Sequence, residues 1–90
     1  MTDTNTVLAE IERERAAQDQ QWGGTEHDDS HRPELWDGLI WKFLRRAAEA
    51  DRRGQWFGSP EWHAERRRRL VQVAALAVAA IESMDRQLGR

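Results

Sequence analysis

Apolar residues recur at spacings of three and four in three segments of the chain. No segment alternates apolar and polar residues, as a half-buried strand would. Residues 3–21 carry a thin apolar stripe, residues 33–52 a broad one, and residues 60–88 are the longest helical segment. The pattern therefore predicts an all-α fold, a three-helix bundle that forms a single helical domain over residues 1–90.

Glycine and proline separate these segments. Gly23 and Gly24 are expected to end the first helix, and the polar stretch that follows, up to Arg32, is predicted to be a loop. Residues 53–60 contain two glycines and one proline, which predicts a second break. Ser59 and Pro60 then provide a cap and a first helical position for the last helix.

The last segment contains an apolar run, residues 70–81, that covers nearly every side of a helix. A lone three-helix bundle buries only part of such a helix. We therefore expect a long, apolar C-terminal helix that is covered by a second subunit, so that the protein is a homodimer.

Charge and composition narrow the function classes. Residues 1–37 hold ten acids and three bases, and residues 38–90 hold six acids and eleven bases, which gives the net charge of −2. This polarity favours docking or self-association and makes nucleic acid the least favoured partner. The chain has no cysteine, an apolar run of only 12 residues and an acidic N-terminus. These features predict a cytoplasmic protein that does not insert into membranes.

Two groups of side chains have the chemistry of metal ligands. His27, Asp28, Asp29 and His31 lie within six residues, and their oxygen and imidazole groups suit a divalent cation. Glu82 and Asp85 stand three apart on one helix face and could join them. The alternative is structural, with the loop residues capping turns and with Glu82 paired to an arginine four residues later.

Tryptophan and arginine form the second candidate surface. The chain has five tryptophans. Trp36 sits on the apolar stripe of its helix, and Trp41 falls off it. Arginine forks bind phosphates, and exposed tryptophans anchor interfaces or stack on bases. The predicted binding surface consists of Trp41, Trp56, Trp62, Arg45, Arg46, Arg66 and Arg69. The alternative is that the run of four arginines at residues 66–69 is a solvated helix start, or pairs with acids of the first helix or of a partner chain. The tryptophans would then fill a small core.

Residues 8–31 and 66–86 contain the stretches IERERAAQDQQWG…EHDDSH and RRLVQVAALAVAAIESMDR. Over these residues the chain resembles a group of small phage, prophage and actinobacterial proteins of unassigned function. Some of these are similar to MazG-like, all-α nucleotide pyrophosphohydrolases. That resemblance implies acidic EExxE and ExxD motifs that hold magnesium against nucleotide phosphates. In the corresponding places this chain has Trp36, Asp37, Ile40 and Lys42, and then Arg69 and Gln72. We therefore expect no catalytic residues.

These observations predict a non-catalytic, phage-type interaction protein that needs no cofactor. Its expected partner is another protein, such as a host defence nuclease complex that it would inhibit. The alternative function is a divergent, metal-dependent nucleoside triphosphate pyrophosphohydrolase. In that case His27, Asp28, Asp29, His31, Glu82 and Asp85 would hold Mg or Mn, and arginines would hold the nucleotide.

Overall fold

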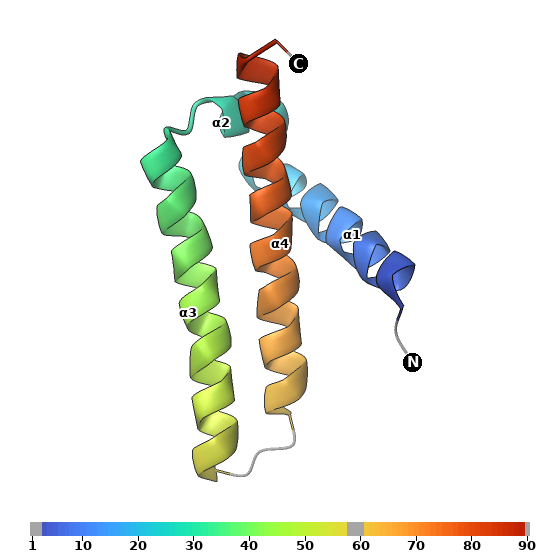
Figure 1. Cartoon of the computed structure of the whole chain (residues 1–90), viewed down its shortest axis with the longest axis vertical. Helices are drawn as coiled ribbons and strands as arrows, with labels where there is room; N and C mark the ends of the chain where they lie inside the picture. Colours follow the sequence, from blue (N-terminus) through green and yellow to red (C-terminus); the bar gives the residue numbers. More distant parts are fainter. Residues whose placement is uncertain (1–2, 58–60, 90) are drawn as a thin grey trace.

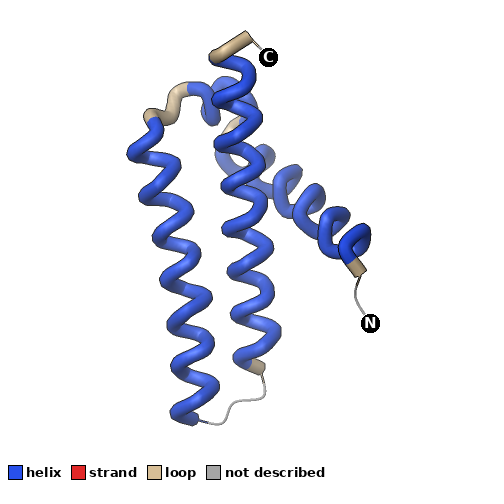
Figure 2. Tube along the Cα trace, viewed as in Figure 1, coloured by secondary structure: helices blue, strands red, loops and turns tan. Residues whose placement is uncertain are grey.

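The computed structural model describes residues 3–57 and 61–89, and within them it contains helices and no strands (Figures 1 and 2). The helices are α1 (Thr4–Trp22), α2 (Gly24–Asp29), α3 (Pro33–Phe57) and α4 (Trp62–Gln87). The all-α prediction is confirmed. The described residues form four helices rather than the three predicted, because α2 occupies the predicted loop.

The two ends of α1 follow from local chemistry. The Asp3 carboxylate accepts a hydrogen bond from the Thr6 N–H at 2.9 Å and caps the first turn. That bond also lowers the pKa of Asp3. Gly23 ends the helix with φ of 107°, a left-handed conformation that favours glycine, and donates its N–H to the Asp19 carbonyl at 2.9 Å.

The short helix α2 replaces the predicted polar loop. Gly23 and Gly24 turn the chain, and Gly24–Asp29 then forms a short helix that ends at Ser30. The Ser30 hydroxyl donates to the His27 carbonyl at 2.6 Å, and the backbone N–H of Ser30 bonds to two earlier carbonyls. The prediction was wrong because polar composition does not distinguish a loop from a short helix that is fixed by its tertiary contacts.

The third helix is longer than predicted. The helix continues through residues 53–57, where a break was expected. It ends at Phe57, so Gly54 lies inside the helix. A glycine inside a helix costs only about 1 kcal/mol relative to alanine, which packing elsewhere on the helix can offset. The predicted break is therefore wrong for the backbone of residues 53–57, which include Trp56 and Phe57. Their side chains and the predicted cap at Ser59 and Pro60 lie outside the described part of the structure.

Helices α3 and α4 form an antiparallel hairpin, and α1 crosses α4 (Figure 1). Four side chains from the hairpin form the buried cluster: Trp36 and Phe43 from α3, and Leu76 and Ala79 from α4. Further along the hairpin, Ala47, Ala50 and Ala75 are also buried, and their small side chains allow the two helices to approach closely. The whole chain measures 48 × 29 × 20 Å, so the molecule is elongated along this hairpin.

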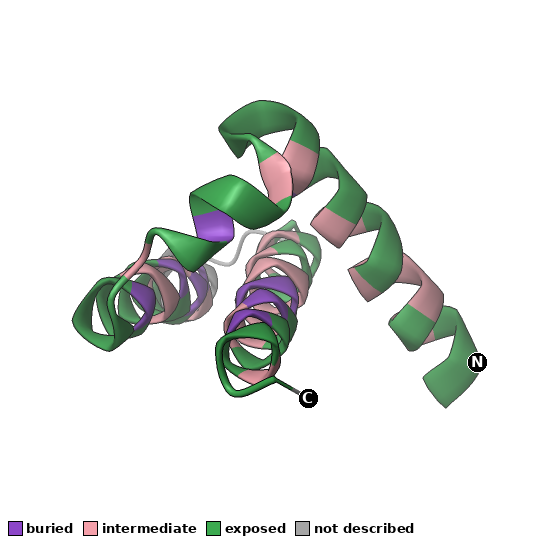
Figure 3. Ribbon diagram, turned by 90° about the horizontal axis from the view of Figure 1, so that it is seen from above, coloured by how far each residue is buried: buried purple, intermediate pink, exposed green. Residues whose placement is uncertain are grey.

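The hairpin has one covered side and one open side. Seen from above, α1 and α2 both lie on the same side of α3 and α4 (Figure 3). Several large apolar side chains are consequently left exposed: Trp41 and Leu44 on α3, and Val78, Ile81, Met84 and Leu88 at or near the end of α4. None of the helices in the described ranges is long and apolar enough to cross a membrane.

Candidate functional site

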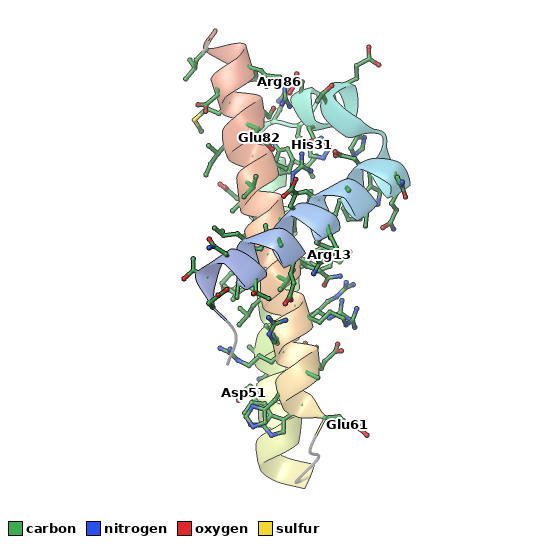
Figure 4. The ribbon with its side chains drawn as sticks, turned by 90° about the vertical axis from the view of Figure 1, so that its right-hand side faces the viewer. Arg13, His31, Asp51, Glu61, Glu82 and Arg86 are labelled. Carbon is green, nitrogen blue, oxygen red and sulfur yellow. The ribbon has the colours of Figure 1, made fainter. Side chains whose placement is uncertain are left out.

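The predicted metal-binding residues are brought close together by α2. This helix packs beside the C-terminal part of α4, so that Asp28 and Asp29 approach residues more than 50 positions later in the chain. Figure 4 shows His31, Glu82 and Arg86 at this end of the molecule. Asp28 and Glu82 lie against Arg15 and Asp29 lies against Arg86, so these three carboxylates face arginine side chains.

Arg15 of α1 is the centre of the first group. Its Nη1 lies 3.1 Å from an Asp19 oxygen, and its Nη2 lies 3.3 Å from Glu82 Oε1 and 3.8 Å from Asp28 Oδ2. The Arg15 side chain is only 14% exposed. One guanidinium therefore lies within 4 Å of three carboxylates, two of which were predicted metal ligands.

Asp28 is the most buried of these acids. The residue is 7% exposed, and its Oδ2 atom has no hydrogen-bond partner within residues 3–57 and 61–89. Burial raises the pKa of the Asp28 carboxyl, and the nearby Arg15 opposes this only in part. Its distance to Arg15 is too long for a hydrogen bond, so the ion pair leaves the carboxylate incompletely satisfied.

Asp29 belongs to a second and better-bonded group. Its Oδ1 accepts hydrogen bonds from Arg86 Nη2 at 2.7 Å and from the Ser83 hydroxyl at 2.8 Å. These bonds, that of Arg86 foremost, lower the pKa of Asp29. Ser83 is 1% exposed, so this contact fixes α2 on a buried position of α4.

The two histidines lie beside this cluster. The His27 and His31 rings stand edge to face with their centroids 4.6 Å apart, and His31 is 4.8 Å from the Trp36 ring. Both line a cavity of about 320 Å³ between α1, α2 and the α3–α4 hairpin, together with Asp28, Trp22 and Phe43. Across residues 3–57 and 61–89, no three histidine or acidic side chains form a group that could hold a metal ion.

The tryptophans and arginines of the predicted binding surface have different environments. Trp41 is 61% exposed, and Arg45, one turn further along α3, is exposed as well. The Arg46 Cζ atom lies 4.9 Å from the centroid of the Phe43 ring. The ring centroids of Trp62 and His63 are 3.6 Å apart.

The remaining members of that surface are also dispersed. Arg69 donates to Glu65 at 3.0 Å and to Gln72 at 3.1 Å, while Arg66 is exposed. The Trp56 side chain lies outside the described residues.

The alternative that arginines pair with acids of the first helix is confirmed at one position. Arg67 Nη2 donates to Glu10 Oε1 of α1 at 2.9 Å, in a two-pronged contact. This contact lowers the pKa of Glu10 and raises that of Arg67. Together with Arg15, it ties α1 to α4 at two places.

Two residues that organise the site, Arg15 and Ser83, were not predicted from the sequence. The spacing of Arg15 and Asp19 signals a local ion pair, but the approach of Glu82 depends on how α1 crosses α4. Ser83 carried a weaker signal, a small polar residue within a largely apolar helix.

Comparisons with protein-family models, with curated proteins and with solved structures gave no match to this chain.

Proposed function

We propose that this chain is a small, non-catalytic helical protein that is homodimeric and binds another protein. The observation that carries the proposal is the outer face of α3, where Trp41 is 61% exposed and is followed one turn later by exposed Arg45. Tryptophan and arginine are the residues most enriched at the energetic centres of protein interfaces. An exposed tryptophan beside an exposed arginine therefore supports a docking role.

The position of these two residues supports a surface that is separate from the core. Phe43 faces α4. At 100° per residue about the axis of α3, Trp41 is rotated by about 160° from Phe43 in one direction and Arg45 by about 160° in the other. They thus lie on the side of α3 that points away from α4. The resemblance to phage-type proteins favours a bacterial host protein as the partner.

The carboxylates support a structural role in place of catalysis. Asp28 and Glu82 lie against Arg15, and Asp29 is bonded to Arg86 and to α4. A guanidinium in contact with a carboxylate competes directly with a cation for the same oxygen atoms. These residues therefore hold α1, α2 and α4 together.

The test is capture of a partner from host lysate by the immobilised chain, compared across matched variants. We expect a captured protein to be retained by the parent and by Leu35→Ala, a change of another exposed α3 side chain, and to be lost with Trp41→Ala. Equal capture by Trp41→Ala and the parent, or no specific capture at all, would contradict the proposal. Circular dichroism of each variant establishes that the fold is intact.

A further inference from the structure

Six apolar residues of α4 and its C-terminal cap form a regular stripe, which we call the α4 stripe. Its members are Leu70, Ala74, Ala77, Ile81, Met84 and Leu88. The spacings between them are four, three, four, three and four, which is the heptad pattern of a coiled-coil seam. Three of the six are more than half exposed: Ile81 (58%), Met84 (57%) and Leu88 (61%).

The rest of the chain contacts other faces of α4. Leu76 and Ala79 pack against α3, Glu82 binds Arg15 of α1, and Ser83 binds Asp29 of α2. At 100° per residue, the centre of the α4 stripe is rotated by roughly 120° from Leu76, toward the side opposite α1 and α2. This is the open side of the hairpin that is visible in Figure 3.

The exposed part of the α4 stripe is as large as the largest apolar patch on a typical soluble monomer. Ile81, Met84 and Leu88 alone expose on the order of 300 Å² of apolar side chain, comparable to the largest patches on soluble monomers. Leu44 and Val78, which are 40% and 38% exposed, lie outside the stripe and extend the apolar surface available to a docked helix.

The order of large and small residues along the α4 stripe indicates which molecule docks on it. The N-terminal half of the stripe contains Ala74 and Ala77, whereas the C-terminal half contains Ile81 and Met84. When the stripe is laid against a reversed copy of itself, Ala77 faces Ile81, Ala74 faces Met84, and Leu70 faces Leu88. Each alanine then receives a large side chain, and every layer pairs an a with a d position, as antiparallel coiled coils do.

A parallel copy would not fit in this way. It would set Ala74 against Ala74 and Ala77 against Ala77, leaving a gap between the helices. It would also crowd Met84 against Met84 in the same seam. Gaps and overpacking both reduce stability in a closely packed interface.

We propose that a second copy of this chain docks on the α4 stripe in the antiparallel direction, about a two-fold axis at the level of residue 79. This inference rests on the proposed homodimer and specifies the surface that forms it. The two α3–α4 hairpins then form a four-helix arrangement, with α1 and α2 of each copy on its outer sides.

The chain contains no cysteine, so single introduced cysteines report directly on this geometry. A disulfide needs Cα atoms about 4.4–6.8 Å apart. In the proposed dimer, Leu70 of one copy meets Leu88 of the other. Two copies of the same position lie about 27 Å apart along the helix axis, since residues 70 and 88 are separated by 18 rises of about 1.5 Å.

The experiment mixes Leu70→Cys and Leu88→Cys under reducing conditions, allows subunits to exchange, and then oxidises the mixture. We expect at least about ten times more disulfide-linked dimer in the mixture than in either variant alone. The pair Ala74→Cys and Met84→Cys is the second test, in case a leucine variant does not fold. Light scattering of the parent chain measures the dimer itself, at twice 10.5 kDa.

The outcomes separate the two proposals. Crosslinking of each variant with itself would show a parallel seam and overturn the inference. A dimeric parent with no crosslink in either mixture would also overturn it, while leaving the proposed homodimer intact. A monomeric parent at several hundred micromolar would refute both the seam and the homodimer, without bearing on partner binding through Trp41.

Discussion

Replacing Arg15 with glutamine should destabilise the protein mainly through Asp28. The change removes the guanidinium that faces three carboxylates and leaves a neutral side chain of similar reach. Asp19 and Glu82 are 40% and 52% exposed at the side chain, so each of these ion pairs contributes at most about 1 kcal/mol. The Asp28 side chain is only 11% exposed and loses its only ion pair among the described residues.

The size of the Asp28 effect has two bounds. Removing one partner of a fully buried ion pair costs about 3–5 kcal/mol, and this pair is weaker because its atoms lie 3.8 Å apart without a hydrogen bond. The carboxyl can also take up a proton, which at pH 7 costs at most about 4 kcal/mol for an ordinary aspartate. We expect Arg15→Gln to reduce the free energy of unfolding by about 2–3 kcal/mol.

Urea unfolding followed by circular dichroism at fixed protein concentration measures this loss. Asp28→Asn is the matched background, because it removes the buried charge and keeps the shape. In that background Arg15→Gln should cost about 1 kcal/mol, so the coupling between the two changes should be about 1–2 kcal/mol. Because burial raises the pKa of Asp28, the coupling should also shrink as the pH is lowered and that carboxyl becomes protonated. A loss below about 0.5 kcal/mol, or the same loss in both backgrounds, would refute this account of Arg15.

Three further predictions concern the core, the α2 contact and the glycines. Leu76→Ala should reduce the free energy of unfolding by about 2–5 kcal/mol, because the side chain is 2% exposed in the core; a loss below 1 kcal/mol would contradict this packing. The pKa of Asp29 is lowered in the folded protein. The ionised Asp29 carboxylate therefore contributes fully to stability above about pH 4, and this contribution is lost as the pH falls through the lower pKa of the folded state. Acid unfolding curves of the parent and Asp29→Asn should therefore converge toward low pH, and a constant gap would contradict the contact. Gly23→Ala should lower the free energy of unfolding by about 1–2 kcal/mol, because Gly23 has φ of 107°, a conformation that alanine rarely adopts. Gly38→Ala should raise it by about 0.5–1 kcal/mol, because Gly38 lies inside a helix with open space around it. Equal melting temperatures of the two alanine variants would be inconsistent with these backbone assignments.

The parts of the fold that depend on one helix at a time were predictable. The periodicity of α3 placed Trp36 on the core face and Trp41 off it, and the structure finds them 7% and 61% exposed. The cap of α1 and its end at Gly23 also follow from nearby residues. These features need only the 3.6-residue repeat and the conformational preferences of Asp and Gly.

The features that were not predicted depend on contacts between distant segments. Ser83 and Arg86 bind Asp29 across 54 and 57 residues, and this docking stabilises a short helix that polar composition does not reveal. The same holds for the candidate metal site. The sequence left open whether its carboxylates meet near the end of α4, and the position of Arg15 beside two of them depends on the crossing of α1 over α4.

The way in which α1 is attached makes the stability of the molecule uneven. Among its described residues only Gln18 is buried, and its links to α4 include the ion pairs of Arg67 with Glu10 and Arg15 with Glu82. Interactions of partly exposed charges weaken as salt increases, whereas the apolar contacts between α3 and α4 do not. In hydrogen-exchange terms, we therefore expect α1 to open as a separate cooperative unit, at a lower free energy than the hairpin. Each opening would uncover the second face of α4, so we expect higher ionic strength to increase how much of this helix is accessible from solution.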